Sequence, residues 1–174
     1  MNLIAVVLLC TGMLGSDPDI ITGSDLRIFL RQQDITQEQL KGVLARNLDR
    51  SDAVSIAYKG MCQTMMAQHV FLPTAKLDYF NQGTRTIEEA ILLDEKNAEL
   101  RYIRLLVQLN APWFLGYNKN VSEDMEVFLK AVESDKISGY WRKKFIADLL
   151  MSKNLLPEHK TELEKAMNFN RTRI

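Results

Sequence analysis

Apolar residues recur at intervals of three and four from Ser24 onward, which is the spacing of one face of an α-helix. Capping residues and prolines separate the periodic stretches. No stretch alternates between apolar and polar residues in the way that predicts a β-strand. The pattern therefore predicts an all-α fold of about eight helices. They are expected near residues 24–32, 36–48, 51–70, 73–94 and 98–110, and from Ser122, Ser138 and Pro157 onward.

Several predicted helix ends carry local signals. Thr36 and Gln39 form a capping box, in which each side chain can satisfy a backbone donor of the other residue. Pro112 ends the fifth helix, because proline disfavours a helical backbone in the residue before it. Gly83 falls in the middle of the fourth helix, where glycine costs roughly 1 kcal/mol relative to alanine. We therefore expect a close approach of two helix backbones at Gly83.

The fifth predicted helix, 98–110, is apolar over most of its circumference and should be the most central. Short connections should place neighbouring helices antiparallel. On the seventh helix, Trp141 is expected to face inward, whereas Arg142, Lys143 and Lys144 are expected to face water. The predicted architecture is thus a stack of antiparallel helix pairs.

The charge balance narrows the range of partners. The chain has 22 Lys and Arg against 22 Asp and Glu, a formal net charge of zero. Without an overall positive field, neither nucleic acid nor anionic lipid is an expected partner, and contact with a membrane is expected only through an uncleaved leader. The chain also has only eight Gly and four Pro, fewer than the turns of an all-β fold of this length would need. Composition and periodicity therefore agree on a helical protein.

The first fifteen residues, MNLIAVVLLCTGMLG, contain no charged side chain. This length is typical of the apolar part of a signal peptide and short for a membrane span. We interpret residues 1–16 as a signal peptide and 17–174 as a single helical domain that is exported, periplasmic or secreted. An uncleaved or lipid-modified anchor, and a leader packed into a cytosolic fold, are the alternatives. Cys10 lies within this leader, so a chain from which the leader has been cleaved keeps only Cys62. We interpret Cys62 as a buried apolar residue.

The run IEEAILLDEKNAELRYIRLLVQL, residues 87–109, resembles the junction between two tetratricopeptide repeats. Ala90 takes the small position near the end of one helix, Asp94 starts the turn and Asn97 opens the next helix. Glu95 replaces the turn proline of that family, and Pro73 falls inside what should be the preceding inner helix. The resemblance implies stacked helix pairs, and the position of Pro73 implies helices longer than those of the family.

A wider stretch, residues 58–129, resembles a group of exported bacterial helical proteins whose function is uncharacterised. The resemblance implies export, and it assigns no functional residue. The matching segments are AYKGMCQTMMAQHVFLPTAKLDYFNQG, ELRYIRLLVQLNAP and FLGYNKNVSEDMEVFL.

Candidate chemistry is sparse. His69 and His159 are far apart in the sequence, and no metal-binding spacing, nucleophile motif or phosphate loop accompanies them. Adjacent carboxylates occur at Glu88-Glu89 and Asp94-Glu95, but neighbouring helical residues point about 100° apart. We interpret both pairs as solvated surface. No catalytic residue, metal ligand or cofactor is predicted.

The segment from Pro112 to Tyr117 places four large apolar side chains within five residues of a predicted loop. One interpretation is that Trp113, Phe114 and Leu115 fold back as a lid over the helix stack. The other is that Trp113 and Tyr117, with Asn118 as a polar contact, form a surface for a partner.

The favoured function is a non-enzymatic interaction or scaffold module in the bacterial envelope, with a protein or peptide partner. On this hypothesis the inner helices add Tyr58, Arg101, Tyr102 and Arg104 to the contact face. Two alternatives stay open. One is a membrane-tethered structural subunit held by an uncleaved leader. The other is an enzyme with an acid/base pair assembled from distant helices, such as a carboxylate near His69.

Overall fold

The computed structural model describes residues 20–168, and within that range the fold is all-α, as predicted, with eight helices. The predicted signal peptide, Cys10 and the tail after Asn168 lie outside the described residues. None of the described helices combines the length and apolar character needed to span a bilayer. The helices are α1 (Gly23–Phe29), α2 (Gln37–Ala45), α3 (Ala53–Met66), α4 (Pro73–Leu93), α5 (Ala98–Asn110), α6 (Val121–Glu133), α7 (Gly139–Leu150) and α8 (Pro157–Asn168).

Local signals position several helix starts. The capping box of Thr36 and Gln39 is present before α2, and an additional one, made by Thr22 and Asp25, begins α1. The sequence pattern missed one element, a parallel pairing of β1 (Ile20–Ile21) with β2 (Asn47–Leu48). Strands of two residues are too short to show an alternating pattern, so periodicity cannot detect them.

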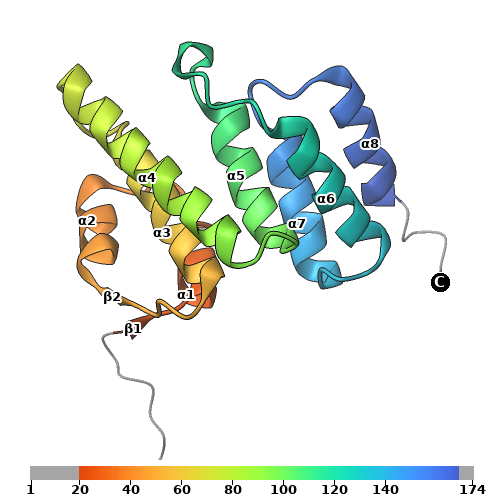
Figure 1. Ribbon diagram of the computed structural model, residues 1–174, viewed down its shortest axis with the longest axis horizontal. Coiled ribbons are helices and arrows are strands. Elements are labelled where there is room, and N and C mark those ends of the chain that lie inside the picture. The colour runs from red at the N-terminus through yellow and green to blue at the C-terminus, as the bar shows by residue number, and fades with distance from the viewer. Residues whose placement is uncertain (1–19, 169–174) are drawn as a thin grey trace, which may run out of the picture.

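The helices from α3 to α8 follow one another along the long axis of the molecule, and each runs in the opposite direction to the one before it (Figure 1). Three connections therefore lie along one side of the stack, the upper edge in Figure 1: the α3–α4 turn (67–72), the α5–α6 loop (111–120) and the α7–α8 turn (151–156). The α4–α5 turn (94–97) and the α6–α7 turn (134–138) lie along the opposite, lower edge. The two edges therefore carry different segments of the chain.

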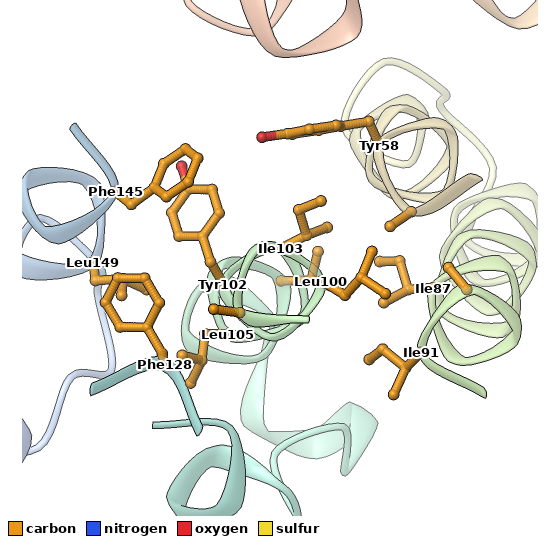
Figure 2. Packing of buried hydrophobic residues seen from close by; sticks show 14 of the residues in the cluster. Tyr58, Ile87, Ile91, Leu100, Tyr102, Ile103, Leu105, Phe128, Phe145 and Leu149 are labelled. Atoms are coloured by element: carbon orange, nitrogen blue, oxygen red, sulfur yellow. The ribbon is translucent and has the colours of Figure 1, made fainter. Parts of the chain in front are cut away.

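Helix α5 occupies the centre of the core, as its apolar circumference predicted (Figure 2). Ile103 is fully buried, and the half-buried Leu106 packs against the core. Tyr102 stacks on Phe145 of α7 with ring centroids 4.0 Å apart. Ile87 of α4 faces α5 from the other side (Figure 2). Removing these side chains from water on both sides of α5 is the main favourable contribution to stacking.

Gly83 of α4 meets Gly60 of α3 at the expected close approach of two helix backbones. A Cβ atom added to Gly83 would lie 2.5 Å from the Gly60 carbonyl oxygen, and one added to Gly60 would lie 2.7 Å from the Gly83 carbonyl oxygen. Real Cβ atoms do not tolerate such distances. Both positions therefore require glycine if α3 and α4 are to pack this closely.

Candidate functional site

The α5–α6 loop is the best candidate for a contact surface, and its backbone is built as a tight turn. After Pro112, residues Trp113–Leu115 form the short 3₁₀ turn η1. Gly116 follows with a φ angle of 63°, in the left-handed region that glycine adopts without steric cost. Its N–H donates a hydrogen bond of 3.1 Å to the Trp113 carbonyl oxygen and closes the turn.

Tyr117 holds this loop against α4. Its hydroxyl donates a hydrogen bond of 2.7 Å to Glu88 Oε1, and its ring meets Phe80 edge to face with centroids 5.7 Å apart. Burial raises the pKa of Tyr117, and the carboxylate of Glu88 raises it further. The base of the loop is also held, because the Asn120 N–H donates to Gln108 Oε1 at 3.1 Å.

Trp113 and Phe114 project from this anchored loop into solvent. Trp113 is 83% exposed and Phe114 is 69% exposed, and their rings contact each other edge to face. The lid interpretation is therefore wrong for these two side chains, and only Leu115 packs against the core. Asn118 is also exposed. The loop thus places Trp113, Phe114 and Asn118 at the surface, whereas Tyr117 is half-buried and anchors them.

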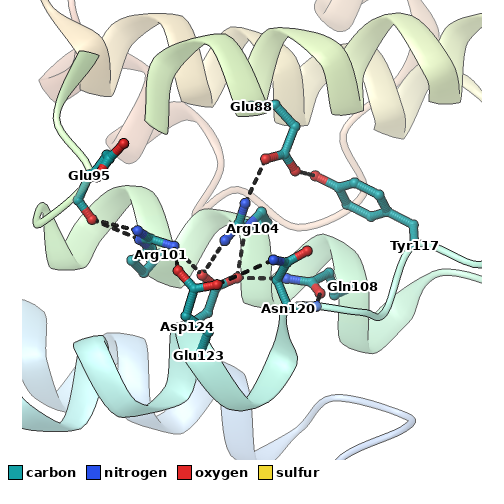
Figure 3. A network of polar contacts seen from close by, with 9 residues as sticks. All are labelled: Glu88, Glu95, Arg101, Arg104, Gln108, Tyr117, Asn120, Glu123 and Asp124. Atoms are coloured by element: carbon teal, nitrogen blue, oxygen red, sulfur yellow. Dashed lines mark hydrogen bonds and ion pairs between the residues drawn. The ribbon is translucent and has the colours of Figure 1, made fainter. Parts of the chain in front are cut away.

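Arg101 and Arg104 of α5 do not lie on a contact face, contrary to the prediction. Both are buried beneath α6, where they surround the fully buried carboxylate of Asp124 (Figure 3). Arg101 donates to Asp124 Oδ1 at 2.9 Å, and Arg104 donates to both carboxylate oxygens at 2.6 and 2.7 Å. Gln108 adds a fourth hydrogen bond of 2.7 Å. We call these four residues the Asp124 cluster.

The cations of the Asp124 cluster have further partners at its margins. Arg101 donates to the Glu95 carbonyl oxygen and to Glu123, and Arg104 donates to Glu88 at 2.5 Å (Figure 3). Burial lowers the pKa of Arg104, but its bonds to Asp124 and Glu88 outweigh that effect and raise it overall. Glu88 is therefore a partner of the cluster, and its side chain is also 41% exposed to solvent.

Tyr58 and Tyr102 are also interior residues, which removes them from any contact face. Tyr58 donates a hydrogen bond of 2.7 Å to Glu99, which also accepts two from Arg27 at 2.6 and 2.7 Å. Tyr102 donates one of 2.5 Å to Asp148. Burial raises the pKa of both tyrosines, and the neighbouring carboxylates raise it further. Both hydroxyls are neutral donors within the structure.

Two predictions for other residues had opposite outcomes. Arg142 is buried and not exposed to water, because its guanidinium turns back to Asp135 at 2.5 Å, whereas Lys143 and Lys144 are exposed as expected. Cys62 is fully buried, as predicted, and burial raises the pKa of its thiol to about 12.

One cavity of about 440 Å³ opens at the lower edge, between the beginnings of α5 and α7. Arg27, Lys96, Lys136 and Trp141 line it, together with the carboxylate of Glu99. Both oxygens of Glu99 already accept hydrogen bonds from Arg27 or Tyr58. Arg27 and Glu99 thus form a largely buried ion pair that borders the cavity on one side. Within residues 20–168, no three His, Cys, Asp or Glu side chains are placed to hold one metal ion.

Comparisons with models of known protein families, with curated proteins and with solved structures find no match for this chain. Function is therefore inferred from the geometry of the molecule, and the feature that supports an inference is the α5–α6 loop with its exposed aromatic side chains. Sequence reasoning identified this loop by its density of apolar residues. It missed the burial of the charged residues on α5, for which the only signal was their position on a helix that is apolar over most of its circumference.

Proposed function

We propose that the protein is a non-enzymatic, exported interaction or scaffold module of the bacterial envelope, and that the α5–α6 loop is its contact surface. The observation that carries the proposal is the exposure of Trp113 and Phe114 on a loop anchored by Tyr117. Large aromatic side chains contribute most to binding when the segment that carries them is already ordered, because little conformational entropy is then lost on binding. The bond from Tyr117 to Glu88 supplies that restriction.

Export and the helix-pair design are parts of the same proposal. The uncharged apolar run of the first fifteen residues and the resemblance to exported helical proteins support export. The alternation of antiparallel helices supports the tetratricopeptide-like interpretation, in which stacked pairs present extended surfaces to partners. Sequencing the N-terminus of the chain purified from cells tests the leader directly. A terminus near residue 17 is expected, and an intact Met1 would favour the tethered alternative.

Site-specific photo-crosslinking tests the contact surface. A photoreactive amino acid replaces Phe114 in one variant and Leu92 in a matched control. Leu92 is similarly exposed but lies near the end of α4, at the lower edge. In a bacterial envelope fraction, we expect adducts from position 114 to exceed those from position 92 several-fold. Equal yields at the two positions, or no adduct at position 114, would contradict the proposal.

A further inference from the structure

Exposed apolar side chains are concentrated on the upper edge. Of the twelve large apolar residues that are exposed within residues 20–168, six lie on its three connections. Phe71 is 93% exposed and Met151 is 83% exposed, comparable to Trp113. Single exposed apolar residues are ordinary, but a group on one side of a molecule indicates a partner. The six are Phe71, Leu72, Trp113, Phe114, Met151 and Leu156.

Hydrogen bonds join two of these three connections, the α7–α8 turn and the α5–α6 loop. The Asn154 N–H and side-chain amide donate to the carbonyl oxygens of Leu109 and Ala111, at 3.1 and 3.3 Å. The Asn110 side chain donates to Ser152 Oγ at 3.1 Å. The α7–α8 turn is thereby fixed to the base of the α5–α6 loop, which Tyr117 fixes to α4. The α5–α6 loop and the α7–α8 turn, which carry four of the six residues, are therefore held in a fixed position relative to each other.

The two edges differ in the sign of their excess charge, although the chain as a whole is balanced. The three upper connections carry Lys119, Lys153 and no acidic residue; with the adjoining first residues of α4 and α8 (67–78, 111–120 and 151–160) the count is four lysines against Asp78 and Glu158. The lower-edge segments 92–98 and 133–140 carry four acidic residues against two lysines. The basic excess thus coincides with the apolar edge. The four upper-edge lysines are Lys76, Lys119, Lys153 and Lys160.

The shape of the upper edge favours one kind of partner. The exposed apolar residues lie on the connections of the upper edge (Figure 1), whereas the residues that line the cavity lie at the lower edge. A lipid bilayer requires no groove, because its interfacial region accepts separate protruding side chains. Tryptophan and phenylalanine enter that region readily, and nearby lysines are attracted to anionic headgroups.

We propose that the upper edge docks on the surface of a lipid bilayer with anionic headgroups, with Trp113, Phe114, Phe71 and Met151 inserted at the interface. This rests on the proposed function, because it names the target of the same α5–α6 loop. The contact is peripheral, and the lysines of the flanking turns lie against the headgroups. This contact is distinct from attachment to a membrane through the leader, because the leader consists of residues 1–16.

Tryptophan fluorescence tests this contact locally. The chain has two tryptophans, so Trp141→Phe leaves Trp113 as the single reporter in the full chain. With vesicles of phosphatidylethanolamine and phosphatidylglycerol, we expect a blue shift of Trp113 emission and quenching by brominated lipid. If Trp141→Phe does not fold, the emission difference between the natural chain and Trp113→Phe reports the same side chain. An apolar leader can bring the chain to vesicles but cannot by itself shift Trp113 emission.

Matched variants test the edge as a whole. Phe114→Ser with Met151→Ser should lower the vesicle partition coefficient about tenfold, because two large apolar groups no longer leave water. The control, Leu92→Ser with Leu93→Ser, removes two exposed leucines beside Asp94 and Glu95 and should change it less than twofold. Replacing phosphatidylglycerol with phosphatidylcholine should weaken binding several-fold.

Three outcomes would overturn the proposal: Trp113 emission unchanged by vesicles, equal losses in the two double variants, or no effect of the anionic lipid. If Trp113 ignores vesicles while position 114 crosslinks to a protein, the bilayer is the wrong target and the proposed interaction function stands. If position 114 also yields no adduct, both proposals fail.

Discussion

Charged residues are usually exposed and large aromatic residues usually buried, but two regions of this molecule show the reverse. They are the interior between α5 and α6, and the upper edge. The interior contains the charged Asp124 cluster, and the edge exposes aromatic side chains. Each buried charge of the cluster has several partners, because an unpaired charge removed from water would cost a large amount of free energy. Trp113 and Phe114 make no comparable set of contacts with the core. The comparison indicates that the interior polar groups maintain the structure, whereas the exposed apolar groups are available for binding.

The largest expected effect is at the centre of the interior cluster. Asp124→Asn should lower the free energy of unfolding by about 3–5 kcal/mol, because Arg101 and Arg104 lose the charge between them. Urea denaturation of purified protein measures this change. The control is Glu123→Gln, which removes an exposed partner of Arg101 and should cost less than about 1 kcal/mol. Similar losses in both variants would mean that burial adds nothing to the role of Asp124.

The backbone contact between α3 and α4 should give the next largest effect. Gly83→Ala should cost about 2–3 kcal/mol of unfolding free energy, because its Cβ cannot fit against the Gly60 carbonyl oxygen. Gly42→Ala is the matched control, since no atom lies within 4 Å of the added Cβ. It should raise stability by roughly 0.5–1 kcal/mol through helix propensity. Thermal melts that rank the two alanine variants in the opposite order would refute the close approach.

Tyr117 joins the two regions, so its substitution should give an intermediate effect. Tyr117→Phe keeps the ring on Phe80 but removes the hydrogen bond to Glu88 and should cost about 1 kcal/mol. Tyr140→Phe, at an exposed position, should change stability by less than about 0.5 kcal/mol. Denaturant unfolding followed by circular dichroism compares the two. No loss in Tyr117→Phe would mean that the bond does not anchor the loop.

The pH dependence of stability provides a second measurement on Tyr117. Its pKa is raised in the folded protein, so above the ordinary value of 10.0 the unfolded chain loses a proton that the folded chain keeps. Stability therefore falls as the pH rises above that value. Tyr117→Phe should make this fall shallower, by up to about 1.4 kcal/mol per pH unit. Identical slopes for the two proteins would contradict the buried, neutral state of Tyr117.

The smallest expected effect on stability is at the upper edge. Trp113→Ala with Phe114→Ala should change the free energy of unfolding by less than about 0.5 kcal/mol, because both side chains are already in water. Leu115→Ala, one residue further on, should cost about 1–2 kcal/mol because Leu115 packs against the core. Calorimetry of the two variants measures the difference. A large loss from the Trp113 and Phe114 variant would indicate a structural role for the edge.

Much of the fold was predictable because its signals are local. Helical periodicity, the Thr36 capping box and the prolines act within a few residues of chain, and α5 was predicted with its observed bounds. The candidate site was predictable only in part. Apolar density identified the α5–α6 loop, but it could not show whether Trp113 and Phe114 turn inward or outward.

The charged residues show why the rest could not be predicted. Arg101 and Arg104 were predicted to lie on a contact face because they belong to an inner helix, but both are buried with partners that satisfy their charge. Asp124 lies in the first turn of α6, where a favourable helix dipole was reason enough for an acidic residue. Its position between two arginines appears only when α6 packs across α5 (Figure 3).

The sequence by itself determined which segments are helical, that α5 is central and where two helix backbones approach at Gly83. These properties depend on the order of apolar, capping and small residues along the chain, so a linear pattern records them. Only the tertiary structure decided which charges are neutralised inside and that three turns distant in the sequence lie along the same side of the helix stack. Both are properties of side chains separated widely in sequence, and their energies depend on distances that exist only once the helices have packed.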